Sequence, residues 1–370
     1  MKTYNFIWTI LVLTSILFSC KNNEDEEPDH TYQPTPYNID IPFGFPTRIY
    51  IPDDNPLTVE GIELGRYLFY DTRLAGRADE GKLMSCSSCH KQENGFIIGL
   101  PRPHPFGLDS IPTHHAMLPL INLIWNPGHL GWNGSVSSIE DDVLAVITDP
   151  SEFGSSFEAV EKAITEIPGY PELFEKAFGS KEVKVERIAK AIAQFVRTII
   201  SADSKFDKYL RGEIQLTNAE LHGFVLFTTE EGADCFHCHG GAGNPLFTTN
   251  LFYNNGKDTV FTDPVDRYSI TGDPMDKGAY KASTLRNIEY TAPYMHDGRF
   301  NTLDEVINFY SHELQWSPQI DPLMHHIANN GTQLTPIEKE DLKAFLYTLS
   351  DTAFLNNPEL GKPDKFPDEQ

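Results

Sequence analysis

Basic residues are scarce in this chain of 370 residues, which has 29 lysines and arginines against 53 aspartates and glutamates. The net charge of −24 argues against binding to nucleic acid or to an anionic membrane surface, because both are themselves negative. The same charge would suit a basic partner, or it would simply keep an exported protein soluble.

The N-terminus lacks a hydrophobic run long enough to span a bilayer. Lys2 precedes an apolar stretch at residues 7–18, shorter than the ~20 residues that a stable transmembrane helix needs. The stretch ends in Leu17-Phe18-Ser19-Cys20, which resembles a bacterial lipobox with an unusual phenylalanine. Residues 1–20 are therefore expected to be a lipoprotein signal peptide with lipidation at Cys20. An ordinary secretory signal or an uncleaved anchor is the alternative.

Cysteine is also scarce, and its five positions leave none for a disulfide. Beyond Cys20, the four others stand in two C-x-x-C-H motifs, Cys86-Ser-Ser-Cys89-His90 and Cys235-Phe-His-Cys238-His239. In this motif the thiols form thioethers to a haem, and the histidine ligates the iron. A zinc site is the alternative, but it would not need a histidine after each second cysteine. Two covalently bound haem c groups are expected, with His90 and His239 as iron ligands, and their attachment outside the bacterial cytoplasm fits export.

Polar, acidic composition with several prolines predicts a flexible tether at residues 21–51. The remaining sequence repeats itself around the two haem motifs. Gly65-x-x-Leu68-Phe69 and Trp132-Asn-Gly134 in the first half correspond to Gly223-x-x-Leu226-Phe227 and His296-Asp-Gly298 in the second. Two similar haem domains are therefore expected at residues 52–205 and 206–355, with a tail at 356–370.

Helical signals dominate the sequence. Residues 58–70 and 185–200 have apolar side chains at helical spacing, and Thr217-Asn-Ala-Glu220 is a capping-box pattern. The proline- and glycine-rich stretches at 99–113 and 240–280 predict long loops, and no alternating strand pattern is evident. The expected fold class is mostly α, with two cytochrome c-like haem domains and long loops.

From about Leu57 to Leu349 the chain resembles the bacterial dihaem cytochrome c peroxidases and their relative MauG. The resemblance rests on the two C-x-x-C-H motifs and on sequence blocks such as Asp149-Pro-Ser-Glu152 and Thr291-Ala-Pro-Tyr-Met-His-Asp-Gly298. It implies one haem per domain, with hydrogen peroxide at the N-terminal haem and electrons entering through the C-terminal haem.

The resemblance also implies three catalytic candidates. Glu152 takes the place of the distal carboxylate that moves a proton during O–O cleavage, although a solvated loop acid is the alternative. Asp142 stands where the family has a glutamine. Trp132 falls between the haems, where it would assist electron transfer or serve only as core packing.

The axial ligands differ from those of the peroxidases. Tyr310 stands where the peroxidases have methionine and MauG has tyrosine, so Tyr310 is the expected second ligand of the C-terminal haem iron. The alternatives are His312, Met275 and Met295. In the loop after the first motif, the histidines do not match the family's removable ligand, and an open first haem is expected; a bis-histidine resting state is the alternative. These loop histidines are His104, His114 and His115.

Calcium near the domain boundary is a further implication of the resemblance. The carbonyls of Thr291 and Pro293 match the family's ligand positions, but Ala116 replaces an asparagine ligand, so occupancy is an open expectation.

The sequence is consistent with three functions. The first is an exported, lipid-anchored peroxidase on the periplasmic side of the cell envelope, which takes electrons from a small donor such as a cytochrome c. The second is a MauG-like oxidase acting on a protein or small molecule, and the third is a non-catalytic electron carrier or redox sensor. A homodimer is expected only because family members are often dimers.

Overall fold

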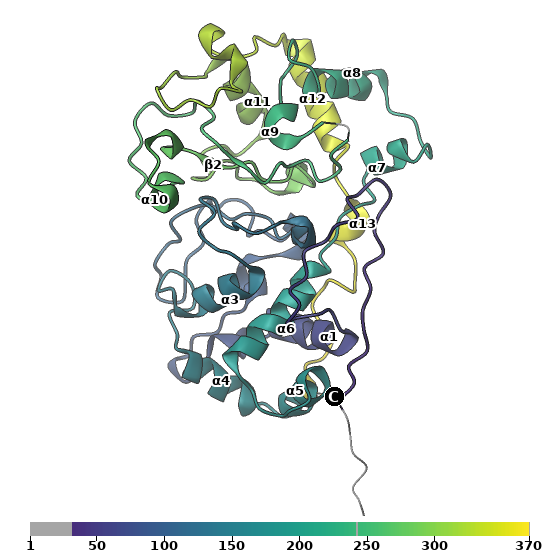
Figure 1. Ribbon diagram of the computed structural model, residues 1–370, viewed down its shortest axis with the longest axis vertical. Coiled ribbons are helices and arrows are strands. Elements are labelled where there is room, and N and C mark those ends of the chain that lie inside the picture. Colours follow the sequence, from purple (N-terminus) through teal and green to yellow (C-terminus); the bar gives the residue numbers. More distant parts are fainter. Residues whose placement is uncertain (1–31, 242, 370) are drawn as a thin grey trace, which may run out of the picture. The chain divides into compact units, whose positions relative to one another are not determined.

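Helices dominate the computed structural model, which describes residues 32–241 and 243–369, so the predicted fold class is confirmed (Figure 1). Cys20 and the predicted signal peptide lie outside the described residues. None of the helices in the described part of the chain has both the length and the apolar character needed to cross a membrane. The α-helices are α1 (Val59–Tyr70), α2 (Cys86–Cys89), α3 (Ile139–Thr148), α4 (Phe157–Thr165), α5 (Tyr170–Phe178), α6 (Val185–Arg197), α7 (Lys205–Leu210), α8 (Asn218–Phe227), α9 (Phe236–His239), α10 (Tyr268–Thr271), α11 (Leu303–His312), α12 (Pro336–Tyr347) and α13 (Thr352–Leu355).

Strands contribute little to the described residues. Strand β1 (Phe252–Tyr253) pairs antiparallel with β2 (Tyr280–Lys281) within one two-stranded sheet. Both strands lie at or near the stretch 240–280 that the sequence predicted as loop, which also contains α10. The stretch 99–113 has no helix or strand, as predicted.

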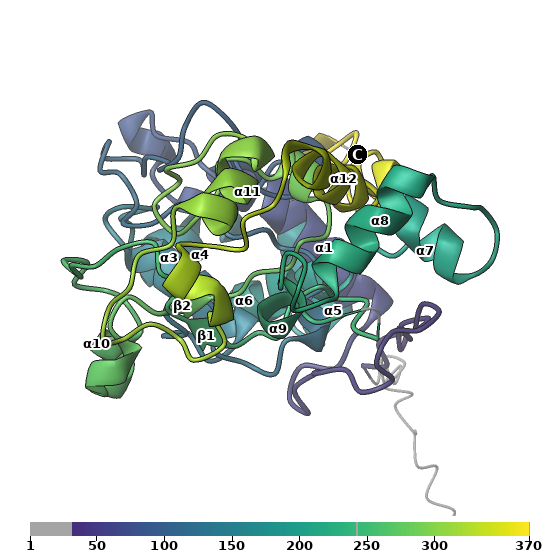
Figure 2. The ribbon, with the colours of Figure 1, turned by 90° about the horizontal axis from the view of Figure 1, so that it is seen from above.

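Each haem motif is accompanied by a pair of tightly packed helices. Helix α1 packs against α6 in the first half, and α8 packs against α12 in the second; Figure 2 shows α8 and α12 side by side. A Cβ atom added to Gly65 would lie 1.9 Å from the Ala191 carbonyl oxygen, and one added to Gly223 would lie 1.9 Å from the Asp341 oxygen. The repeated glycine therefore has the same role in both halves, because it lets two helix backbones touch.

Replacing Gly223 by alanine is expected to lower the free energy of unfolding by at least ~1–3 kcal/mol, because α8 and α12 must separate to admit the methyl group. Gly243 is a matched control, since an added Cβ there would meet nothing within 4 Å. Urea denaturation of both alanine variants checks the expectation. Equal stability of the two variants would contradict it.

The capping box predicted at the start of α8 is present. The Thr217 hydroxyl accepts a hydrogen bond from the Glu220 amide at 3.3 Å, and the Glu220 carboxylate accepts one from the Thr217 amide at 2.8 Å. These bonds satisfy amides that the first turn of a helix otherwise leaves without partners. A short polar motif thus fixes where this helix begins.

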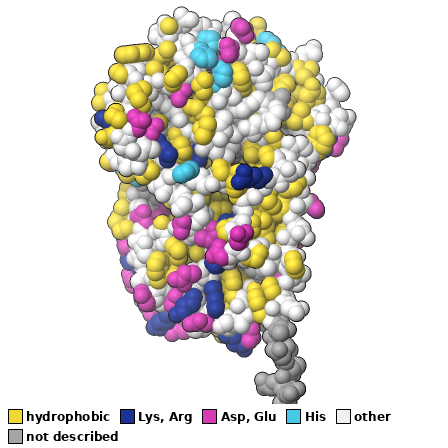
Figure 3. Space-filling view, in the orientation of Figure 1, with side chains coloured by type: hydrophobic (Ala, Val, Ile, Leu, Met, Phe, Trp, Pro, Cys, Tyr) yellow, Lys and Arg dark blue, Asp and Glu magenta, His cyan; other side chains and the backbone are white. Residues whose placement is uncertain are grey.

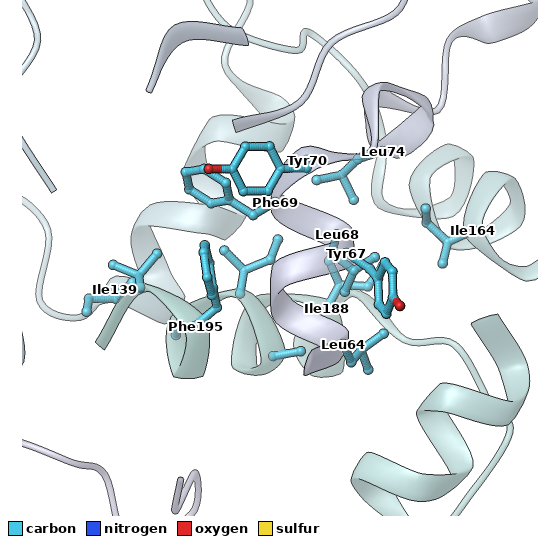
Figure 4. Close-up of a cluster of buried hydrophobic side chains, with 14 of the residues drawn as sticks. Leu64, Tyr67, Leu68, Phe69, Tyr70, Leu74, Ile139, Ile164, Ile188 and Phe195 are labelled. Carbon is cyan, nitrogen blue, oxygen red and sulfur yellow. The ribbon is translucent and has the colours of Figure 1, made fainter. Parts of the chain in front are cut away.

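Two separate apolar clusters form the cores of the two halves. The first lies between α1, α4, α5 and α6, and Figure 4 shows Leu64, Leu68 and Phe195 packed within it. The second lies between α8, α11 and α12 and includes Phe227 and Phe345. Each cluster lies beside one haem motif, because Cys86 packs against the first cluster and Cys235 against the second.

Two repeated asparagines tie the halves together. Asn122 and Asn287 both have left-handed backbones, with φ of 60° and 56°. The Asn122 amide group exchanges two hydrogen bonds with the Ser201 backbone, at 2.9 and 3.1 Å. The Asn287 side chain donates to the Ser201 hydroxyl at 3.0 Å and accepts from the Asp351 amide at 2.7 Å. This buried polar network connects both halves at Ser201.

Residues 33–51 are ordered parts of the structure, although the sequence predicted them as a flexible tether. Phe45 is buried, and its ring centroid lies 5.0 Å from that of Trp125. The Tyr50 amide donates to the Ile124 carbonyl at 2.8 Å. The body therefore begins well before residue 52, because apolar residues within this polar segment find partners far along the chain.

The predicted tail at 356–370 also packs, through its described residues, against the first half. Leu360 is buried in the first apolar cluster, and its carbonyl accepts a hydrogen bond from the Tyr70 hydroxyl at 2.7 Å. Asp368 forms an ion pair with Arg73 at 2.7 Å. The C-terminus thus returns to the neighbourhood of α1 and α5, as Figure 1 shows.

Candidate functional site

The first C-x-x-C-H motif forms the short helix α2, and His90 caps its C-terminal end. The Nδ1 atom of His90 lies 2.7 Å from the Phe96 carbonyl oxygen. Phe96 has a φ of 62°, so the chain turns back on itself at this point. Since a carbonyl can only accept, Nδ1 carries the proton, and the lone pair of Nε2 is left to bind a metal.

The second motif repeats this arrangement in α9. The Nδ1 atom of His239 lies 3.1 Å from the Ser283 carbonyl oxygen, which again leaves Nε2 as the ligand atom. Burial lowers the pKa of both His90 and His239 to about 4, so both imidazoles are neutral near pH 7. Neutral imidazole is the form that ligates iron.

The residues around both motifs fit covalently bound haem. All four motif cysteines are free, so no disulfide competes for their thiols. Cys235, Cys238 and His239 share one cavity (the His239 cavity), whose wall is mainly apolar, as a porphyrin requires. Its apolar lining includes Leu285, Ile288, Leu303, Val306, Ile307, Leu342 and Leu346.

Two carboxylates face the space beside His90. Asp142, from α3, and Glu152, from the loop that follows α3, line the two adjoining cavities that His90 also lines (together, the His90 cavity). No hydrogen bond from a described residue reaches either carboxylate. The structure therefore brings together His90, Asp142 and Glu152, which the sequence analysis had assigned to the N-terminal haem site.

Burial gives these two acids unusual proton affinities. It raises the pKa of Asp142 to about 6. Burial, the charge of Asp149 and the charge of Asp142 together raise the pKa of Glu152 to about 7. An acid with a pKa near the working pH can both accept and release a proton, which is what general acid–base chemistry needs.

A neighbouring loop holds Glu152 in place through a glycine that sequence reasoning missed. The Leu108 amide donates to the Glu152 carbonyl at 2.9 Å. A Cβ atom on Gly107 would lie 2.4 Å from the Ser151 carbonyl carbon, so only glycine allows this approach. Nothing in the sequence marks this glycine, because its partner lies more than forty positions away.

Trp132 lines both the His90 cavity and the His239 cavity. Its indole Nε1 donates to the Ala116 carbonyl at 2.7 Å, and its own carbonyl accepts from the Lys281 amide at 2.9 Å. Lys281 also lines both cavities. Trp132 thus borders both cavities, and its position between two bound haems stays a prediction.

Two candidates for the second ligand of the C-terminal iron line the His239 cavity. Tyr310, from α11, and Met295 both reach it, and the Asn255 side chain contacts both. Asn255 Nδ2 lies 2.9 Å from the Tyr310 hydroxyl and 3.8 Å from the Met295 sulfur. The other two alternatives, Met275 and His312, are exposed and do not line the cavity.

The three loop histidines are engaged elsewhere. The ring nitrogens of His104 lie 3.0 and 3.2 Å from the carbonyls of Thr113 and Asp297. His114 and His115 contact the Asp263 carboxylate through Nε2, at 2.8 and 2.6 Å. His115 also borders the His90 cavity.

At the expected calcium site, two of the nearby oxygen atoms already take part in hydrogen bonds within the protein. The Ala116 carbonyl, next to the missing asparagine side chain, is already the acceptor for Trp132. Thr291 is buried, and its hydroxyl donates to the Ile288 carbonyl at 3.4 Å.

Comparisons with known proteins agree with this geometry. A family model described as di-haem cytochrome c peroxidase matches residues 59–215. Methylamine utilization protein MauG of Methylorubrum extorquens is 31% identical over 321 residues, which cover 86% of each chain. Cytochrome c551 peroxidase of Nitrosomonas europaea is 34% identical over 260 residues, covering 68% of this chain and 73% of the relative.

A solved structure supports the same relationship. A MauG-like protein associated with microbial copper homeostasis is 34% identical, with a TM-score of 0.79, over 89% of this chain and 100% of that one. The diheme peroxidase BthA from Burkholderia thailandensis shares the fold, with a TM-score of 0.64 at 19% identity.

Proposed function

The chain belongs to the di-haem cytochrome c peroxidase family, and we propose that it reduces hydrogen peroxide to water with electrons from a small donor such as a c-type cytochrome. Membership makes it an oxidoreductase with two haem c groups. The observation that carries the proposal is the pair of half-buried carboxylates, Asp142 and Glu152, in the His90 cavity. A protein that only carried electrons would have no use for them.

When bound, the two haems supply the redox-active irons for a reaction that consumes two electrons and two protons per peroxide. His90 and His239 would hold these irons through Nε2, because Nδ1 of each faces a backbone carbonyl. The Glu152 carboxylate would accept a proton from the peroxide and return it to the departing oxygen. Burial, followed by the charges of Asp149 and of Asp142 in the same cavity, keeps the pKa of Glu152 raised. Trp132 borders both cavities, where it would assist electron transfer from the second haem to the first.

Steady-state turnover tests this function. The haem-loaded protein is mixed with reduced cytochrome c, and oxidation of the donor is followed with and without hydrogen peroxide. Rapid oxidation that depends on peroxide supports the peroxidase. Negligible turnover with every small donor, despite two attached haems, would overturn it.

Tyr310 favours the second candidate, a MauG-like oxidase. Its side chain lines the His239 cavity, and a relative 31% identical is itself named MauG. A phenolate ligand would stabilise ferric iron more than a thioether does, which suits oxidation of a protein or small molecule.

The variant Tyr310→Phe is expected to change the low-spin electron paramagnetic resonance signal of the C-terminal haem, because the ligand oxygen is lost. Met295→Leu is the matched variant, since Met295 lines the same cavity and contacts the same Asn255 side chain. A signal altered only by Met295→Leu would make the methionine the ligand and remove the support for the oxidase.

The remaining features of the proposal concern organisation and location. We place the peroxidatic haem in residues 52–205 and the electron-transfer haem in residues 206–355. The family is typically periplasmic, and the lipobox-like sequence supports export with a lipid anchor at Cys20. Calcium bound by the Thr291 and Pro293 carbonyls rests on the resemblance alone, as does a homodimer.

A further inference from the structure

A second group of metal-ligating side chains lies beside the second haem motif, at the margin of the His239 cavity, which Asp234, His325 and His326 also line. The outer histidine cluster consists of Glu230, His237 and His325, with Asp234 and His326 beside them. One ligand atom from each of the first three residues lies within 4.8 Å of the other two. Figure 3 shows histidine side chains gathered beside acidic ones on the face of the C-terminal half.

The cluster holds His237 in the orientation that metal binding requires. His237 Nδ1 donates to Asp234 Oδ1 at 2.5 Å, and the Asp234 side chain is only 7% exposed. The lone pair therefore resides on Nε2, which lies 3.6 Å from Glu230 Oε1. A carboxylate that fixes a histidine in this way is the usual outer partner of a metal-bound imidazole.

His325 and His326 lie beside His237 and Glu230 in this cluster. The His325 ring centroid lies 5.0 Å from that of His237, and its Nδ1 lies 3.6 Å from Asp234 Oδ2. His326 Nε2 donates to the Glu230 carbonyl at 2.6 Å, which anchors the backbone beside the first ligand. Glu230 and His237 therefore come from one stretch of chain and His325 from another, and the two stretches are already in contact.

A comparable cluster elsewhere is less suited to a metal. His114 and His115 each hydrogen-bond directly to Asp263, at 2.8 and 2.6 Å, and the Tyr280 hydroxyl donates to the same carboxylate at 2.6 Å. These ligand atoms already satisfy one another. In the outer histidine cluster, by contrast, His237 Nε2 and Glu230 are too far apart for a hydrogen bond.

We propose that the outer histidine cluster binds one divalent first-row transition metal ion, and that Cu²⁺ binds more tightly than Zn²⁺. Two imidazoles and a carboxylate are a ligand set for these ions, whose affinities follow the order Zn²⁺ < Cu²⁺. Metal–ligand bonds of ~2.0–2.2 Å require ligand atoms roughly 3.4 Å apart. The Glu230 and His325 side chains, 59% and 41% exposed, are free to move that far, and water completes the coordination.

An ion bound in this cluster would affect the nearby haem because of its position. This step of the inference, unlike metal binding itself, rests on the proposed function. His237 stands between Cys235 and Cys238 in the second haem motif. A bound ion is therefore next to the attachment edge of the haem that receives electrons. Its positive charge raises the reduction potential of that haem, and redox titration with and without Zn²⁺ measures the shift.

Isothermal titration of the haem-loaded protein, purified without a histidine tag, with Cu²⁺ tests the binding itself. We expect a site that His325→Ala weakens at least ~10-fold and Asp234→Asn weakens ~10–100-fold. His222→Ala is the matched control, because His222 is also an exposed histidine paired with a carboxylate, Asp341, at 2.7 Å. Nitrogen hyperfine splitting in the Cu²⁺ spectrum should weaken in His325→Ala only.

Absence of Cu²⁺ binding, or equal affinity in His325→Ala and His222→Ala, would overturn the site. Binding lost only in His114→Ala would place the ion at the other cluster and likewise overturn it. Failure of peroxide turnover with Cu²⁺ binding intact would remove the proposed function and leave the metal site standing.

Discussion

Replacing Glu152 by glutamine is expected to lower kcat for peroxide reduction by ~10²–10⁴-fold, the range for a lost general acid–base group. Glutamine keeps the size and polarity of the side chain but cannot accept a proton at neutral pH. Glu152 lines the His90 cavity without a hydrogen-bond donor among the described residues, so no other contact needs to be replaced. Stopped-flow kinetics with reduced cytochrome c measure the change.

The same residue predicts the pH dependence of the wild type. The pKa of Glu152 is raised to about 7, first by burial and then by the charges of Asp149 and Asp142. Only the deprotonated form accepts the peroxide proton, so kcat/KM should rise with pH through about 7 and level off above it. Asp142→Asn removes one of the raising charges, and the rising limb should move to lower pH.

An exposed acid provides the control for both measurements. Glu166 lies at the end of α4, where its only ion pair with a described residue is with Lys162 at 3.9 Å. Glu166→Gln should leave kcat and the pH profile unchanged. Full turnover by Glu152→Gln would refute the role of this acid, although peroxide reduction by the haem protein could still be correct.

Local sequence patterns lead directly to those features that depend on neighbouring residues. The C-x-x-C-H motifs predict both proximal histidines, and the capping box predicted at Thr217 does begin α8. The duplicated glycines, Gly65 and Gly223, correspond to equivalent close contacts between helices. In each case the chemistry is determined by residues a few positions apart.

Features that depend on distant backbone were not predictable. The partner of His239 is the carbonyl of Ser283, which lies more than forty positions further along the chain. Asn255, which contacts both candidate ligands Tyr310 and Met295, lies in a stretch that composition marks only as loop. Such contacts are decided by tertiary packing and not by local preference.

The mistaken tether boundary has the same cause. Acidic and proline-rich composition correctly describes the average of residues 21–51 but hides the apolar residues among them. Phe45 packs on Trp125, and the Arg286 guanidinium lies 4.8 Å above the Phe45 ring. Neither partner is near in sequence, so composition alone could not show that the segment docks.

Removing that arginine should cause the largest loss of stability. Arg286 is fully buried and pairs through both terminal nitrogens with Asp207, at 2.9 and 2.7 Å, while its Nε donates to the Pro245 carbonyl at 2.5 Å. Burial by itself raises the pKa of Asp207, but the hydrogen bonds and charge of Arg286 hold that pKa below its usual value.

Arg286→Leu leaves the Asp207 carboxylate buried without its counter-ion, and we expect a loss of ~3–5 kcal/mol in the free energy of unfolding. Adding Asp207→Leu should recover much of the loss, because the unpaired charge then disappears. Arg211→Gln is the control: its ion pairs with Asp203 and Glu213 are more exposed and should contribute less than ~1 kcal/mol each. Urea denaturation followed by far-ultraviolet circular dichroism compares the variants. If Arg286→Leu loses no more free energy of unfolding than Arg211→Gln, the buried pair does not stabilise the second half.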